Sequence, residues 1–327
     1  MNRKVSVAPM MDCTDRHERY FLRIISKNTL LYTEMVVDEA IYRGDKKKLL
    51  EFNVREKPVA LQLGGSTPKL LVEATKIGED FGYDEINLNL GCPSRKVEKN
   101  KFGACLMKEP NLVADCLNEM QSVTKLPITI KTRIGYDNVE DYENFYNFIS
   151  ILKTTGIKTF IIHARKAMLG KFTPKQNLNI PPLKYDYVYN LKKDFYNDEI
   201  IINGGITTIE EIKTHIKKVD GVMIGRAAYH TPYLLADIEK EIFKNKDVPS
   251  RQEVIERLIP YVKDELKKGT RLNQIMRHTL GLFHGQEGSS NWKRYLSENM
   301  CIRDADVQKI DHIMDKVKFN NDEIRVG

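Results

Sequence analysis

Short apolar or alternating apolar/polar runs recur along the first two thirds of the chain, and segments with helical spacing of apolar residues separate them. Eight of these runs are typical of β-strands: residues 5–9, 30–34, 59–63, 85–89, 128–132, 159–163, 199–203 and 221–224. Strands that alternate with helices form a parallel sheet, and eight such units are the number that closes a (β/α)8 barrel. The pattern therefore predicts an α/β fold of the TIM-barrel class.

The segments between the runs support this prediction. Residues 68–81 and 110–123 each begin with proline and repeat apolar residues at helical spacing. A doubly wound open sheet is the main alternative, but no G-x-G-x-x-G turn follows the first strand. We therefore expect a closed barrel.

The pattern changes near residue 233, after which only helical segments follow. We expect helices at residues 234–243, 251–268, 272–283, 290–298 and 304–317, with a linker at 245–250. The predicted organisation is a catalytic barrel over residues 1–232 and a small all-helical domain over residues 233–327.

The amino-acid composition limits which classes of protein are possible. The 327 residues are 41% hydrophobic and 30% charged, with no apolar run of about 18 residues that could span a membrane. The N-terminus enters a strand-like run at once and has no signal peptide, so a cytoplasmic protein is expected. The net charge of +7 favours polyanions in general, although a well-solvated basic surface gives the same value.

The five cysteines are scattered and odd in number, and none belongs to a C-x-x-C pair. This pattern predicts reduced thiols without a disulfide framework or a zinc site, and we expect no bound metal.

Cys92 is a candidate catalytic residue because of its position in the stretch EINLNLGCPS, residues 85–94. Gly91 gives the backbone freedom to turn and Pro93 ends the ladder, which places the thiol on a loop just past a strand. Enzymes with α/β folds keep their chemistry there, but a lone cysteine can equally be a small buried apolar residue. Asn87 and Asn89 favour the chemical role, because neighbouring amides suit hydrogen bonding to a flat heterocycle.

Polar or glycine residues stand at the C-terminal ends of nearly all the predicted strands, where barrel enzymes build their sites. In chain order they are Pro9, Met10, Met11, Gln62, Asn89, Lys131, His163, Asn203, Gly204, Gly205, Gly225 and Arg226. The late glycines and Arg226 suit a phosphate, whereas Lys131 and His163 suit a ring that gains electrons. Each feature alone is usually structural. Together they predict a flat, phosphate-bearing redox cofactor, and flavin mononucleotide (FMN) fits.

These motifs resemble those of the tRNA-dihydrouridine synthases. The matching blocks are residues 8–11 (APMM), 61–65 (LQLGG), 87–93 (NLNLGCP), 131–135 (KTRIG), 163–167 (HARKA), 203–205 (NGG) and 225–226 (GR). In the helical part, residues 276–278 (MRH), 281–283 (GLF) and 292–298 (WKRYLSE) are similar to the A subfamily in particular. The resemblance covers nearly the whole chain.

The resemblance implies an enzyme that reduces D-loop uridines of tRNA, at positions 20 and 20a, to 5,6-dihydrouridine. In this family NADPH reduces FMN, a hydride passes from flavin N5 to C6 of the uracil, and Cys92 would protonate C5. The strand-end residues named above, apart from Asn89, would contact FMN. The residues implied for tRNA are Asn89, Gln176, Asn179, Arg277, Asn291 and Arg294. Leu178 departs from the pattern, because the A subfamily often carries a basic residue there.

Two other functions fit parts of the sequence. A flavin barrel oxidoreductase acting on a free pyrimidine, similar to dihydroorotate dehydrogenase, would share the phosphate site and a loop acid. A non-catalytic barrel that binds RNA would keep only the fold. The C-terminal helices favour the tRNA enzyme, because a small free substrate needs no basic helical domain. Nothing in the sequence indicates an obligate protein partner.

Overall fold

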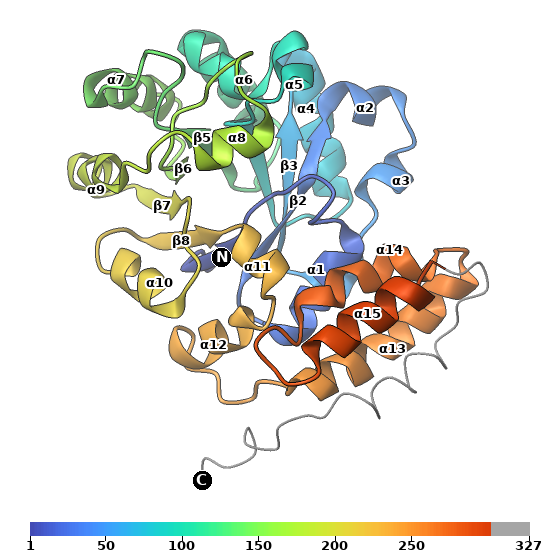
Figure 1. The fold of residues 1–327 in the computed structure, drawn as a ribbon. Helices are drawn as coiled ribbons and strands as arrows, with labels where there is room; N and C mark the ends of the chain where they lie inside the picture. The colour runs from blue at the N-terminus through green and yellow to red at the C-terminus, as the bar shows by residue number, and fades with distance from the viewer. Residues whose placement is uncertain (302–327) are drawn as a thin grey trace. The chain divides into compact units, whose positions relative to one another are not determined.

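The computed structural model describes residues 1–301. Eight parallel strands follow one another around a closed barrel, and β1 pairs with β8 to complete it (Figure 1). The strands are β1 (Val5–Val7), β2 (Leu30–Val37), β3 (Val59–Gly64), β4 (Glu85–Leu90), β5 (Ile128–Arg133), β6 (Thr159–His163), β7 (Glu199–Asn203) and β8 (Gly221–Ile224). The TIM-barrel prediction is confirmed.

All eight predicted runs contain a strand, and β2 differs most in length. It continues to Val37, past an irregularity in its register with β3 between Tyr32 and Met35. A bulge of this kind lets a strand bend without ending its ladder. The alternation of apolar and polar residues therefore does not show where β2 ends.

Helices connect the strands of the barrel. They are α2 (Asp38–Arg43), α3 (Lys46–Leu50), η1 (Val54–Glu56), α4 (Pro68–Asp80), α5 (Arg95–Lys99), η2 (Gly103–Lys108), α6 (Pro110–Ser122), α7 (Tyr142–Lys153), α8 (Pro174–Asn179), α9 (Tyr185–Asp194) and α10 (Ile209–Ile216). The two helices predicted from their first proline, α4 and α6, begin and end within one residue of the expected bounds.

The chain divides into two compact units. The first comprises Met1–Thr14 and Leu30–Gly225 and holds the barrel, whereas the second comprises Asp15–Thr29 and the residues from Arg226 onward. The division near the C-terminus thus falls seven residues before the expected boundary, and the segment after β1 joins the second unit. The RNA-binding role of the helical part stays a prediction.

In the part of the second unit that the structure describes, all regular elements are helices. Its elements are α1 (Arg16–Ile25), α11 (Arg226–His230), α12 (Leu234–Glu241), α13 (Arg251–Lys267), α14 (Leu272–Met276), η3 (Arg277–Gly281) and α15 (Ser289–Asn299). Ser250 caps α13 in a reciprocal capping box with Glu253. The helix expected at 272–283 is instead two short elements, α14 and η3. The helix expected at 304–317 lies outside the described residues.

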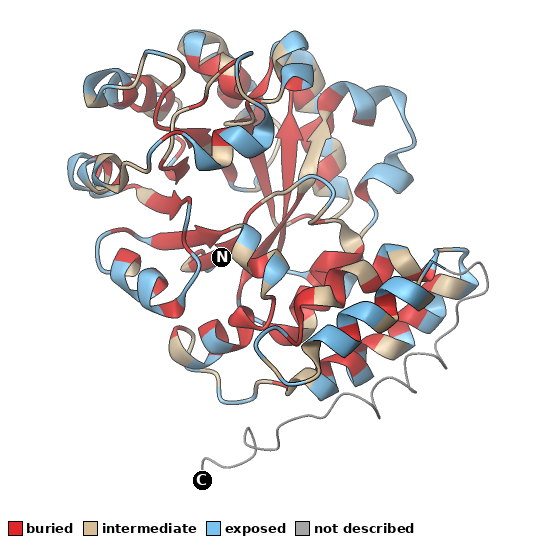
Figure 2. Cartoon of the chain, viewed as in Figure 1, coloured by how far each residue is buried: buried red, intermediate tan, exposed pale blue. Residues whose placement is uncertain are grey.

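The barrel interior combines an apolar layer with a polar base. Small and branched side chains, among them Ala8, Ala60 and Ile161, form one buried cluster. Near the N-terminal ends of the strands, the guanidinium of Arg3 donates to the fully buried Glu85 at 2.7 Å and to Glu199 at 2.8 Å. Figure 2 shows the strands mostly buried and the outer faces of the helices exposed. Among residues 1–301, no helix has the length and apolar character needed to cross a membrane.

Candidate active site

Polar side chains of four neighbouring strands meet at the C-terminal end of the barrel. Asn89 of β4 is in register with Lys131 of β5, and His163 of β6 with Asn203 of β7. The Nζ atom of Lys131 donates to Oδ1 of Asn203 at 3.1 Å. The structure thus brings together four residues that the sequence predicts at one site.

Cys92 lies in the loop after β4, and Asn89 holds this loop in place. Oδ1 of Asn89 accepts hydrogen bonds from the backbone N–H groups of Gly91 at 3.1 Å and Cys92 at 2.9 Å. On the other side, the carbonyl of Cys92 accepts from the N–H of Ala104 at 2.9 Å. The thiol is half-buried. Its backbone is therefore fixed from both sides while the side chain keeps access to solvent.

A chain of side-chain hydrogen bonds runs from Asn89 down into the barrel. Asn89 donates to Gln62, and Gln62 donates to Asn87, each at 2.8 Å. Asn87 donates to the hydroxyl of Thr129 at 2.8 Å, which donates to Glu85 at 2.6 Å. Gln62 is only 1% exposed. Its amide therefore positions Asn89, and the side chain of Asn89 keeps one N–H for a ligand.

Among the residues at this end of the barrel, Lys131 has the most strongly shifted pKa. Burial and the nearby positive charge of Arg133 lower the pKa of Lys131 to about 7, while Cys92 acts in the opposite direction. Burial disfavours the charged form of the amine because it loses its water, whereas a neighbouring anion favours the charged form. An anionic ligand bound beside Lys131 would therefore raise the pKa of this amine again. The protonated amine would then donate a charged hydrogen bond to the ligand.

Arg133 is a site residue that the sequence did not reveal. Its guanidinium is buried and donates to the carbonyls of Gly91 at 2.8 Å, Lys166 at 3.1 Å and Asn177 at 3.2 Å. These bonds join the loop after β4 to the loop after β6. Its position two residues beyond Lys131, on the same face of the strand, is the signal that could have found it.

Two glycines form the turn after β7, and Gly204 is buried whereas Gly205 is exposed. Gly204 has φ 119° and Gly205 has φ 71°, conformations that side chains rarely adopt. A Cβ at Gly204 would lie 2.6 Å from the ring of His163, and one at Gly205 would lie 2.6 Å from Leu183. The sequence therefore needs glycine at both positions, and the turn that they form is bare of side chains.

Met10 is anchored at the end of β1. Its N–H donates to the hydroxyl of Thr14 at 3.0 Å, and that hydroxyl donates back to the Met10 carbonyl at 3.2 Å. Its side chain packs against the apolar layer of the barrel, whereas Pro9 is half-buried and Met11 is 55% exposed. Gly225 ends the first unit just after β8. Arg226 opens α11 and is counted with the second unit.

The loop after β6 carries Gln176 and Asn179, and both are exposed on α8. The side chain of Gln176 completes a capping box by accepting the N–H of Thr173 at 2.8 Å. Between them, buried Asn177 accepts the N–H of Met168 at 2.7 Å and so holds the loop. Sequence reasoning assigned no role to Asn177, although it is the residue that shapes this loop.

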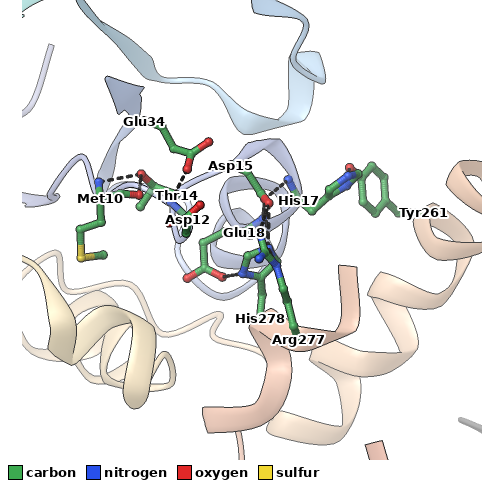
Figure 3. A network of polar contacts seen from close by, with 10 residues as sticks. All are labelled: Met10, Asp12, Thr14, Asp15, His17, Glu18, Glu34, Tyr261, Arg277 and His278. Atoms are coloured by element: carbon green, nitrogen blue, oxygen red, sulfur yellow. Dashed lines mark hydrogen bonds and ion pairs between the residues drawn. The ribbon is translucent and has the colours of Figure 1, made fainter. Parts of the chain in front are cut away.

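In the second unit, Arg277 lies in a polar cluster rather than free on the surface. Its Nη2 atom donates to Asp15 at 2.8 Å, and the ring of His278 contacts Asp15 and Glu18, both at 3.1 Å (Figure 3). Burial alone would lower the pKa of His278, but the carboxylates of Asp15 and Glu18 raise it to about 9. Arg277 therefore serves the packing of α1 against η3, and a contact with RNA would have to share this guanidinium.

The other two residues expected at tRNA are placed differently. Asn291 and Arg294 are both exposed on α15, and the side chain of Arg294 forms no ion pair with any residue in the range 1–301. Trp292 between them is fully buried. The helix thus turns its polar face outward and its aromatic residue inward.

A closed (β/α)8 barrel with its polar side chains gathered at the C-terminal strand ends defines the barrel class of enzymes. The sequence model of the dihydrouridine synthase (Dus) family matches residues 6–318, and the chain belongs to this family. Dihydrouridine carries two hydrogens more than uridine, so the class of reaction is a reduction and the chain is an oxidoreductase.

Curated relatives match over almost their whole length. A tRNA-dihydrouridine(20/20a) synthase of Synechocystis is 52% identical over 316 residues, which cover 96% of this chain and 95% of the relative. A protein of the same name from Escherichia coli K12 is 50% identical over 313 residues, which cover 95% of this chain and 90% of the relative.

Among solved structures, a 2-naphthoyl-CoA reductase in complex with 2-naphthoyl-CoA superposes with a TM-score of 0.53. The sequences are 12% identical, and the match covers 74% of this chain and 50% of the reductase chain. At this identity the likeness concerns the fold alone.

Proposed function

We propose that this protein reduces uridines 20 and 20a in the D-loop of tRNA to 5,6-dihydrouridine, with NADPH as reductant and FMN as the bound cofactor. The observation that carries the proposal is the Asn89–Cys92 turn, which holds a half-buried thiol beside Lys131 at the C-terminal end of the barrel. The curated relatives, about half identical to this chain, supply the positions in tRNA.

Cys92 is the acid in this proposal. Addition of hydride to C6 of uracil leaves negative charge on C5 and the neighbouring carbonyl, and a proton must reach C5 to complete the reduction. A thiol can donate this proton as a general acid. Lys131 is close enough to interact with Cys92 electrostatically, so the protonated form of Lys131 would stabilise the thiolate that remains. Solvent then returns the proton to the sulfur.

Asn89 orients the base. Its oxygen is used by the backbone of the Cys92 loop, and one N–H is used by Gln62. The remaining N–H can donate to a uracil carbonyl, which would set C5 of the ring against the thiol. A base in the D-loop reaches a barrel end only after it leaves the stack, so the uridine is flipped out of the tRNA.

The residues at the barrel end fit FMN. The amine of Lys131 is desolvated, donates to Asn203 and forms no ion pair with a carboxylate among residues 1–301. The turn at Gly204 and Gly205 carries no side chains of its own, and the thioether of Met10 offers a polarisable surface. Lys131, His163 and Asn203 would hold the isoalloxazine, and the glycine turns after β7 and β8 would hold its phosphate. The bound flavin would supply the hydride.

Spectroscopy of the purified protein tests this proposal. We expect a yellow protein with non-covalent FMN, bleached by NADPH and recoloured by tRNA that lacks dihydrouridine. Lys131→Met removes a charged donor to the flavin and should weaken FMN retention about 10- to 100-fold, the scale of one lost charge-assisted hydrogen bond. Lys153→Met is the control, because that lysine lies at the end of α7 and pairs with Asp198.

Three results would contradict the proposal. One is a protein that takes up no flavin on reconstitution, or that holds another cofactor. A second is reduced enzyme that is reoxidised by a free pyrimidine and not by tRNA, which would favour the dihydroorotate-dehydrogenase-like alternative. A third is binding of tRNA without any redox change, which would favour a non-catalytic RNA-binding barrel.

A further inference from the structure

Four basic residues follow the Cys92 loop within seven positions. They are Arg95, Lys96, Lys99 and Lys101, on α5 and the turn after it, and we call them the α5 rim. All four are exposed, and none of their side chains forms a hydrogen bond or ion pair with any residue from 1 to 301. Glu98 is the one acidic residue in the segment. The rim therefore concentrates uncompensated positive charge next to the proposed acid.

Many other basic residues of the barrel unit have carboxylate partners. Lys153 pairs with Asp198 at 2.7 Å, and Lys192 pairs with Asp220 at 2.8 Å. Such pairs neutralise the surface locally. The contrast indicates that the charge of the rim is available to a ligand.

The loop after β6 extends the charged surface. A Cβ at Gly170 of this loop would lie 3.7 Å from the carboxylate of Glu98, so the loop passes close to α5. It carries Lys171 and Lys175, which are exposed and, among the described residues, form no ion pair. The loop that carries these two cations thus passes beside α5.

The backbone ties the rim firmly to Cys92. Ser94 caps α5 by accepting the N–H of Val97 at 3.3 Å, and the buried Val97 accepts the N–H of Phe102 at 3.3 Å. Two residues later, the N–H of Ala104 donates a hydrogen bond to the carbonyl of Cys92. Because the segment closes on itself, a ligand held by the rim is held at a fixed position relative to the thiol.

We propose that the α5 rim binds the phosphates of the RNA strand that flanks the target uridine. The inference rests on the proposed function and extends it, because it assigns part of the grip on RNA to the barrel unit itself. A polynucleotide presents one phosphate per nucleotide and can meet several cations in a row, which matches a charged surface spread over α5 and the neighbouring loop.

The test compares two matched triple variants. Arg95→Ala/Lys96→Ala/Lys99→Ala removes three cations from α5. Lys46→Ala/Lys47→Ala/Lys48→Ala removes three exposed cations from α3, another five-residue helix of the same unit, and these form no ion pair within residues 1–301. Binding of tRNA to the flavin-loaded enzyme is measured at several salt concentrations. The slope of log affinity against log salt should fall by about 2 for the α5 variant, with affinity lowered on the order of tenfold, and stay unchanged for the α3 variant.

Flavin content, melting temperature and the rate of NADPH oxidation should be the same in both variants. An unchanged salt slope in the α5 variant would overturn the inference, and so would a raised KM for NADPH with unchanged tRNA binding, because the rim would then serve the dinucleotide. Failure of the wild-type enzyme to form dihydrouridine would overturn the proposed function instead. The two failures are therefore distinguishable.

Discussion

Replacement of Cys92 by alanine is expected to slow uridine reduction at least about 100-fold while flavin binding and flavin reduction by NADPH continue at nearly the wild-type rate. The thiol would supply only the proton at C5, whereas the groups around the cofactor lie on other strands. Stopped-flow absorbance measures the two half-reactions separately: bleaching by NADPH, and recolouring by tRNA.

Cys105→Ala is the matched control. Cys105 is also half-buried and lies on η2 close to the same loop, but its thiol donates to the carbonyl of Phe102, and burial raises its pKa. We expect wild-type turnover from this variant. Normal dihydrouridine formation by Cys92→Ala would show that Cys92 is structural, which is the alternative that the sequence leaves open for a lone cysteine.

Trp292→Ala is expected to destabilise the second unit by about 3–5 kcal/mol, the cost of emptying a large buried site. The indole is fully buried, donates to the carbonyl of Thr279 at 3.0 Å, and packs edge-on against Phe283 with ring centroids 5.0 Å apart. Denaturant unfolding of the wild type and the variant measures the loss.

Arg294→Ala, on the exposed face of the same helix, provides the contrast. Its effect on stability should stay within about 0.5 kcal/mol, as is usual at the surface, while the salt slope of tRNA binding falls by about one unit. If Trp292→Ala weakened tRNA binding and left stability unchanged, the indole would be a stacking platform for a base. An unchanged slope for Arg294→Ala would remove this residue from the RNA-binding surface.

Much of the barrel could be predicted because its signals are local. Apolar alternation marks each strand, and the chemistry-bearing residues follow directly at the strand ends, where β4 places Asn89 and Cys92 and β5 places Lys131. Parallel strands in a barrel then bring those ends together without further information. This is why the candidate site could be listed residue by residue from the sequence.

The residues that could not be predicted are those whose partners are distant in sequence. Arg277 is exposed in part, and nothing near it indicates Asp15, which lies 262 positions away. The placement of α1 in the second unit follows from the same long-range packing. For Arg133, the spacing from Lys131 could indicate the face of the strand but not the role, because its acceptors are backbone carbonyls, which carry no signal in the side-chain pattern.

The most direct test of the central claim is mass-spectrometric mapping of tRNA from a strain that lacks this protein. The account predicts that dihydrouridine disappears at positions 20 and 20a and returns when the wild-type gene is supplied, but not when the Cys92→Ala variant is supplied. Unchanged dihydrouridine at both positions, in a strain with no second enzyme of this family, would contradict it.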